Sequence, residues 1–261
     1  MKKAIVLLMA LALASPVLAA DIARDPAVVV EGAVAQHDDV IQRGNAAVLA
    51  LLDGAFTDLS AVYATALERS GFTPDIYYDP AGGVDYSDYS LLLVSCADNW
   101  WHSPNYAIEI ESWRSYMAGG GRMILIGQDF LYGSGDYGFP QEYFGMISAV
   151  EDVNGGDASL LTWTGTDMLD GLGGGMQPCY SANSWYTDDV SGVTGLCRWS
   201  TQEHPGSFGG GCASMVGVFS VVEFGCEPGV DGSIDALDRI HGTMFPVATE
   251  PASFSSVKSL Y

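Results

Sequence analysis

Residues 90–129 constrain the fold more than any other part of the sequence. The apolar run 91–94 is typical of a strand that is buried on both faces. A helix is predicted to begin near Ser103 and Pro104, because serine caps helices and proline is tolerated in the first turn. Tyr106, Ile110, Trp113 and Met117 recur at helical spacing, so one apolar stripe of this helix should face the sheet. Three glycines at 119–121 end the helix, and 122–126 predict another strand. The stretch therefore predicts a strand–helix–strand unit of a parallel sheet, in which a crossover helix joins neighbouring strands.

The rest of the chain repeats this alternation of strands and helices. Further strands are predicted from short apolar or alternating runs, and further helices from apolar residues at helical spacing. The expected strands are 46–53, 75–78, 159–164 and 213–224, and the expected helices are 59–67, 141–147 and one that begins at Ser233 and ends at Gly242. We expect an α/β fold with a doubly wound, mostly parallel sheet and helices on both faces.

The domain organisation follows from composition. Residues 1–20 combine a basic start, a short apolar run and small residues before the expected cleavage point, which is typical of a secretory signal peptide; the alternative is an uncleaved anchor. A polar lead-in segment at 21–45 and a tail at 251–261 flank the predicted domain, 46–250. Within it, about 150–212 is rich in glycine and is expected to be a long insertion. No later run reaches the length of a membrane-spanning helix, so we expect an exported protein in the periplasm, on the cell surface or outside the cell.

The chain is strongly acidic. It carries 10 basic and 32 acidic residues, and removal of the two lysines of the signal peptide leaves 8 against 32, a formal charge of −24. Such a surface should repel nucleic acid and anionic membranes. The acidity either keeps an exported protein in solution or provides a calcium-rich surface. Residues 152–157 resemble a calcium loop only in part, because the terminal glutamate is missing, so no cofactor is expected beyond a weak possibility of Ca²⁺.

The chain contains five cysteines, and export permits disulfides. Cys179 with Cys197 and Cys212 with Cys226 are neighbouring pairs that would tie the glycine-rich region, although four cysteines allow three connectivities. Cys96 would then be unpaired. The spacings match no zinc motif, so no metal site is expected.

Four segments carry a resemblance to a known family. They are Gly-Phe-x-x-Asp-Ile-Tyr at 71–77, Tyr-Ser-Asp-Tyr-Ser-Leu-Leu-Leu-Val at 86–94, Asp-Asn-Trp-Trp at 98–101, and Gly-Gly-Arg-Met-Ile-Leu-Ile-Gly-Gln-Asp at 120–129. Together they resemble the glutamine amidotransferase-like domains, flavodoxin-like in fold, that are appended to exported bacterial proteins. The resemblance covers about 46–150 well, and the last strand and helix loosely.

The resemblance also implies that the nucleophile is missing. Catalytic members of the class I amidotransferase fold carry a cysteine on the sharp turn between a strand and the next helix, completed by a histidine and a glutamate. By the resemblance, Gln128 stands at that position in this chain. An amide cannot attack a carbonyl, so amidotransferase chemistry is disfavoured. The alternative nucleophile is Cys96 with His102 as its base, although a small buried thiol is the more ordinary role for Cys96.

Polar and aromatic residues should gather at the carboxyl edge of the predicted sheet, where doubly wound folds bind their ligands. They are Asp53, Asp98, Asn99, Trp100, Trp101, Gln128 and Asp129. The two tryptophans either stack on a sugar or peptide or pack against the protein. The polar groups either hold a cation or a hydroxyl-rich ligand, or cap helices and turns.

Three functions remain open after these observations. The first is an exported, non-catalytic binding or accessory domain with its ligand edge near Trp100 and Trp101, and a glycan, a peptide or an envelope protein as its partner. The second is a cysteine-dependent hydrolase built on Cys96. The third is a structural component of the cell envelope. The oligomeric state and the identity of the ligand do not follow from the sequence.

Overall fold

The computed structural model describes residues 44–52, 58–97, 104–153, 160–176, 186–224 and 230–245. The predicted signal peptide, nearly all of the lead-in segment and the tail lie outside these ranges and stay predictions. Among the described residues, no helix is long and apolar enough to cross a membrane.

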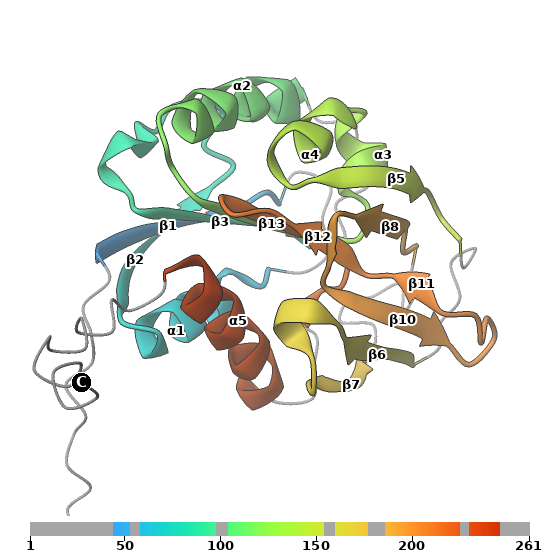
Figure 1. Ribbon diagram of the computed structural model, residues 1–261. Helices are drawn as coiled ribbons and strands as arrows, with labels where there is room; N and C mark the ends of the chain where they lie inside the picture. The colour runs from blue at the N-terminus through green and yellow to red at the C-terminus, as the bar shows by residue number, and fades with distance from the viewer. Residues whose placement is uncertain are drawn as a thin grey trace, which may run out of the picture. The chain divides into compact units, whose positions relative to one another are not determined.

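A seven-stranded sheet forms the centre of the fold, with the strand order β2-β1-β3-β4-β13-β12-β9 (Figure 1). Its first five strands are parallel: β2 (Phe72–Tyr78), β1 (Gly44–Ala50), β3 (Leu91–Ala97), β4 (Met123–Gly127) and β13 (Gly217–Ser220). The strands β12 (Gly211–Ala213) and β9 (Thr194–Gly195) extend the sheet in antiparallel fashion. The prediction of an α/β fold with a mostly parallel sheet is confirmed.

Helices cover both faces of this sheet. In Figure 1, α2 (Pro104–Ala118), α3 (Phe130–Ser134) and α4 (Gly138–Tyr143) lie on one face, and α1 (Ser60–Arg69) and α5 (Val230–Met244) on the other. The strand β4 is buried along its whole length, and so are the last five residues of β1. Burial of consecutive residues is expected where helices cover both faces of a sheet.

Aromatic side chains fill the layer between the sheet and α2. The wholly buried Trp113 of α2 lies 5.9 Å from Phe139 and 6.5 Å from Phe130, measured between ring centroids. Phe130 in turn meets Phe219 of β13 edge to face at 5.7 Å. The apolar stripe predicted for this helix therefore faces the sheet, as its spacing indicated.

The chain between β4 and β13 forms two smaller antiparallel sheets. One has the order β11-β10-β6-β7 and the other pairs β5 with β8. Their strands are β5 (Met146–Val150), β6 (Leu161–Gly165), β7 (Gly173–Met176), β8 (Asp189–Gly192), β10 (Cys197–Thr201) and β11 (Phe208–Gly209). Two short 3₁₀ turns, η1 (Tyr86–Asp88) and η2 (Asp167–Leu169), complete the described elements. Trp163 of β6 packs edge to face on Phe224, with ring centroids 5.3 Å apart, and so joins the four-stranded sheet to the chain that leaves β13.

Three expectations about this part of the chain are wrong. The helix expected at 141–147 ends at Tyr143 and is followed by β5, since Gly145 adopts a left-handed φ of 71° that breaks the helix. The expected last strand, 213–224, is a hairpin of β12 and β13. Gly242 does not end α5, because it keeps a helical backbone and the helix continues to Met244.

Candidate functional site

Four buried side chains that carry a thiol, an amide or a carboxyl group lie at the carboxyl edge of the parallel strands. Cys96 stands near the end of β3, Gln128 and Asp129 follow β4, and Glu223 comes three residues after β13. The four residues are at most 4% exposed. Since the strands run parallel, all four lie at the same edge, as the sequence predicted for three of them.

Gln128 occupies the turn between β4 and α3. Its Nε2 donates to Asp129 Oδ2 at 3.3 Å, and both side chains are buried. The turn also needs the preceding glycine, because a Cβ on Gly127 would lie 2.6 Å from the Cβ of Cys96. Asp129 stands at the N-cap of α3 but makes no capping hydrogen bond, so the capping hypothesis does not describe its side chain.

Cys96 is wholly buried, and burial raises the pKa of its thiol. The neighbouring Tyr106 hydroxyl has a smaller, opposite effect, and Glu223 raises the thiol pKa further. A protonated, enclosed thiol is a poor nucleophile. The expected base, His102, lies outside the described residues.

Two residues of the edge were not anticipated from the sequence as part of a site. Glu223 is wholly buried, and the Tyr63 hydroxyl of α1 donates to its Oε2 at 2.9 Å. Tyr106, expected only as part of the apolar helix stripe, has a buried hydroxyl that interacts with the Cys96 thiol. The signal for Glu223 was present in the sequence, because it is an acidic residue within the apolar run Val-Val-Glu-Phe.

A further buried carboxyl, that of Asp188, lies near this group. Burial raises its pKa to about 8, and the carboxylates of Asp129, Asp152 and Glu151 add to this effect. Its Oδ1 accepts the backbone N–H of Asp152 at 3.1 Å, while its Oδ2 has no hydrogen-bond partner in the described part of the chain. The described residues include no group of three or more side chains arranged to hold a metal ion.

The structure leaves several expected site residues untested. Asp53, Asp98, Asn99, Trp100 and Trp101 lie outside the described residues, so their expected positions at the carboxyl edge stay predictions.

The disulfide predictions are likewise untested. Cys197 and Cys212 are buried and form no disulfide among the described residues, and burial raises the pKa of each thiol to about 12. Their expected partners, Cys179 and Cys226, lie outside the described residues, so both pairings stay predictions.

Comparisons with known proteins place the fold. The sequence matches no protein-family model, and no curated protein matches it significantly. A glutamine amidotransferase from Thermotoga maritima is similar in structure, with 10% identity and a TM-score of 0.53, over 77% of this chain and 99% of that chain. A ThuA-like protein from Bacteroides uniformis aligns with 10% identity and a TM-score of 0.48, over 81% and 95% of the two chains. The first of these similarities shows that the chain has a glutamine amidotransferase-like α/β fold.

Proposed function

We propose that this chain is an exported, non-catalytic binding or accessory domain that uses the carboxyl edge of an amidotransferase-like sheet to hold a ligand. The observation that carries the proposal is Gln128, a buried amide on the turn between β4 and α3, where the resemblance places the amidotransferase nucleophile. Cys96 does not replace that nucleophile, because its thiol is enclosed and its pKa is raised by burial.

The same edge keeps features that suit binding. Buried polar side chains converge there, and the Oδ2 atom of the nearby Asp188 has no hydrogen-bond partner among the described residues. A buried polar group of this kind calls for a partner such as water or a ligand. The adjacent Trp100 and Trp101, which the sequence places in the loop after β3, supply ring faces on which a glycan or a peptide side chain can stack.

The absence of catalysis is tested first. The mature protein is expected to release no ammonia from glutamine above the buffer rate. Iodoacetamide is expected to label Cys96 only after denaturation, because the thiol is wholly buried. The Ala107→Cys variant, which places a thiol at an exposed position of α2, serves as the positive control for labelling. Glutamine hydrolysis, or rapid labelling of Cys96 in the folded protein, would overturn the non-catalytic assignment.

Binding is tested on glycan and peptide arrays. A ligand found there is expected to lose at least about tenfold in affinity when Trp100→Ala and Trp101→Ala are combined, in keeping with the weight of aromatic residues at binding hot spots. Tyr186→Ala is the matched control, since Tyr186 is an aromatic residue that is 44% exposed. Equal loss in both variants would contradict a ligand edge at the two tryptophans.

Export is tested by mass spectrometry of the protein recovered from outside the cytoplasm. The mature chain is expected to begin at Ala20 or Asp21, as the small residues before these positions indicate. A Leu7→Arg and Leu8→Arg variant, which interrupts the apolar run, is expected to leave the full-length precursor inside the cell. Recovery of an uncleaved chain in the envelope fraction would favour an anchor instead.

A further inference from the structure

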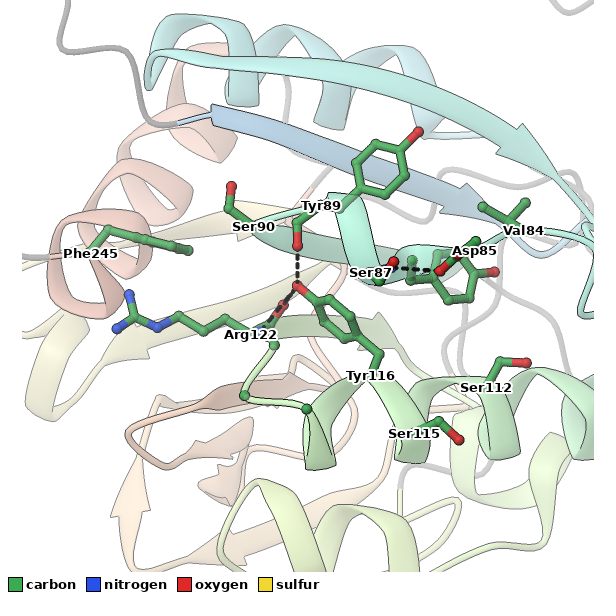
Figure 2. A pocket seen from close by; sticks show the side chains of 14 residues that line it. Val84, Asp85, Ser87, Tyr89, Ser90, Ser112, Ser115, Tyr116, Arg122 and Phe245 are labelled. Atoms are coloured by element: carbon green, nitrogen blue, oxygen red, sulfur yellow. Dashed lines mark hydrogen bonds between the residues drawn. The ribbon is translucent and has the colours of Figure 1, made fainter.

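A pocket lies at the amino edge of the parallel strands, which is the edge opposite to the proposed ligand edge. It has a volume of about 700 Å³. Tyr89 and Ser90 precede β3, and Gly121 and Arg122 precede β4, so these lining residues mark the amino edge of the parallel strands (Figure 2). The pocket is open between η1 and the C-terminal half of α2, and its size suits a ligand of a few sugar rings.

Hydrogen bonds fix both walls of this pocket. The wholly buried Glu109 of α2 accepts the Tyr86 hydroxyl at 2.7 Å and also the backbone N–H of Gly82, which ties the segment around η1 to the helix. The Tyr116 hydroxyl donates to the Tyr89 carbonyl oxygen at 3.1 Å and accepts the N–H of Arg122 at 3.2 Å (Figure 2). The walls are therefore held in place without a ligand.

One end of the pocket carries a positive charge. The Arg122 guanidinium lies 4.4 Å from the centroid of the Phe245 ring, and one of its N–H groups donates to the Met244 carbonyl oxygen. Every ion pair found among the described residues involves Arg114, so Arg122 has no carboxylate partner within them. In a chain with 32 acidic residues, an arginine held on a ring without such a partner keeps donors for an external carboxylate.

The rest of the lining offers hydrogen-bond acceptors. The hydroxyls of Ser112 and Ser115 donate to backbone carbonyls at 3.2 and 3.0 Å, so their oxygen lone pairs are left to accept. Asp85 adds a carboxylate, whose pKa is held below its usual value by the backbone N–H of Ser87. These acceptors match a ligand that brings its own hydroxyl donors.

We propose that this amino-edge pocket binds an acidic saccharide, with the ligand carboxylate on Arg122 and the ligand hydroxyls on the serine oxygens and Asp85. A peptide fits less well, because the backbone N–H groups of the glycine turn 119–121 are already bonded to α2 carbonyls and offer no backbone pairing. A polyphosphate fits less well too, since the pocket has a single arginine and also holds Asp85.

Calorimetric titration of the mature protein with trigalacturonate tests this proposal, with maltotriose as the neutral trisaccharide. Trigalacturonate is expected to bind, and maltotriose to bind at least about tenfold more weakly, because it lacks the carboxylate that Arg122 would pair. Arg122→Gln is expected to weaken binding by at least a similar factor. This variant also removes a bond to α5, so its unfolding temperature is measured alongside.

Ser115→Trp keeps the test decisive if Arg122→Gln fails to fold. Ser115 is exposed on α2 and lines the pocket, so the indole should fill the space without disturbing the core. Its matched control is Ala107→Trp, an exposed position about two turns away on the same helix that does not line the pocket. The proposal is overturned if trigalacturonate fails to bind, if maltotriose binds equally well, or if Ser115→Trp binds as the wild type does. Because this pocket and the carboxyl edge are tested by different variants, the failure of one proposal leaves the other standing.

Discussion

At the scale of single residues, Asp188 makes the stability of the fold depend on pH. Its side chain is wholly buried, and its pKa of about 8 compares with 3.8 in a free side chain. The folded protein keeps this proton while the unfolded chain releases it. The free energy of unfolding should therefore fall as the pH rises from about 4 to about 8, by up to about 1.4 kcal/mol per pH unit.

Asp188→Asn should remove this dependence, because an amide mimics the protonated acid and still accepts the N–H of Asp152. We expect the variant to match the wild type near pH 4 and to exceed it by a few kcal/mol near pH 8, measured by urea unfolding across that range. Asp189→Asn is the control, since Asp189 is partly exposed to water. If both variants keep the slope of the wild type, Asp188 is not the group responsible.

The buried polar residues also show which features of single residues could be predicted from the sequence and which could not. The family resemblance placed Gln128 on a turn between a strand and a helix, and the structure has it between β4 and α3. The apolar run around Glu223 was a local sign that this residue is buried, but its partner was not predictable, since the Tyr63 hydroxyl lies 160 positions earlier in the chain. Asp188 was missed, and the N–H that it accepts, that of Asp152, lies 36 positions earlier. No local pattern reports such pairings.

At the scale of elements, Arg114 joins α2 to α4. Its guanidinium donates to Asp136 at 2.9 Å and to Glu142, lies 3.6 Å from Glu111, and stands 5.3 Å from the centroid of the Phe139 ring. Arg114→Met should destabilise the fold by about 1 kcal/mol, because these carboxylates are partly exposed and exposed ion pairs contribute little each.

The destabilisation caused by Arg114→Met should be smaller when the unfolding experiment is repeated at high salt. Without the arginine the three carboxylates repel one another, and salt screens this repulsion. Arg198→Met provides the comparison, since Arg198 is exposed on β10 and forms no ion pair among the described residues. A loss that is equal in both variants, or that grows with salt, would argue against the proposed link between the helices.

The helices and strands were predictable where the apolar residues of the sequence recur at one clear spacing, helical or alternating. The parallel core was anticipated to within a few residues, for example the helix predicted from Ser103 and Pro104 and observed as Pro104–Ala118. No element was predicted for 171–212, the larger part of the insertion expected at about 150–212, yet it contains strands such as β10. Glycine-rich strands lack the alternating apolar side chains by which a strand is predicted from sequence. The four-residue strand β7 begins with three glycines, which pair with β6 through backbone atoms alone.

At the scale of the whole molecule, the order of the seven strands was not predictable, because it depends on pairings between distant segments such as β4 with β13. Helices between parallel strands predicted the class of the fold but not which strands are neighbours. The carboxyl edge could still be named in advance, since parallel strands share one such edge whatever their order.

The formal charge of −24 expected for the mature chain, 8 basic against 32 acidic residues, gives the last prediction at this scale. Repulsion between so many like charges opposes the compact state, and salt screens it over a Debye length of about 10 Å at 0.1 M. Raising NaCl from about 0.02 M to about 0.5 M should therefore raise the unfolding temperature of the mature protein by about 5 °C, which corresponds to 1 to 2 kcal/mol. Choline chloride is the control for general screening, since both salts should give the same rise. An unfolding temperature that stays flat or falls would contradict the argument. Millimolar CaCl₂ at matched ionic strength separates screening from specific binding, because a rise in unfolding temperature beyond that given by NaCl would support the calcium-rich surface.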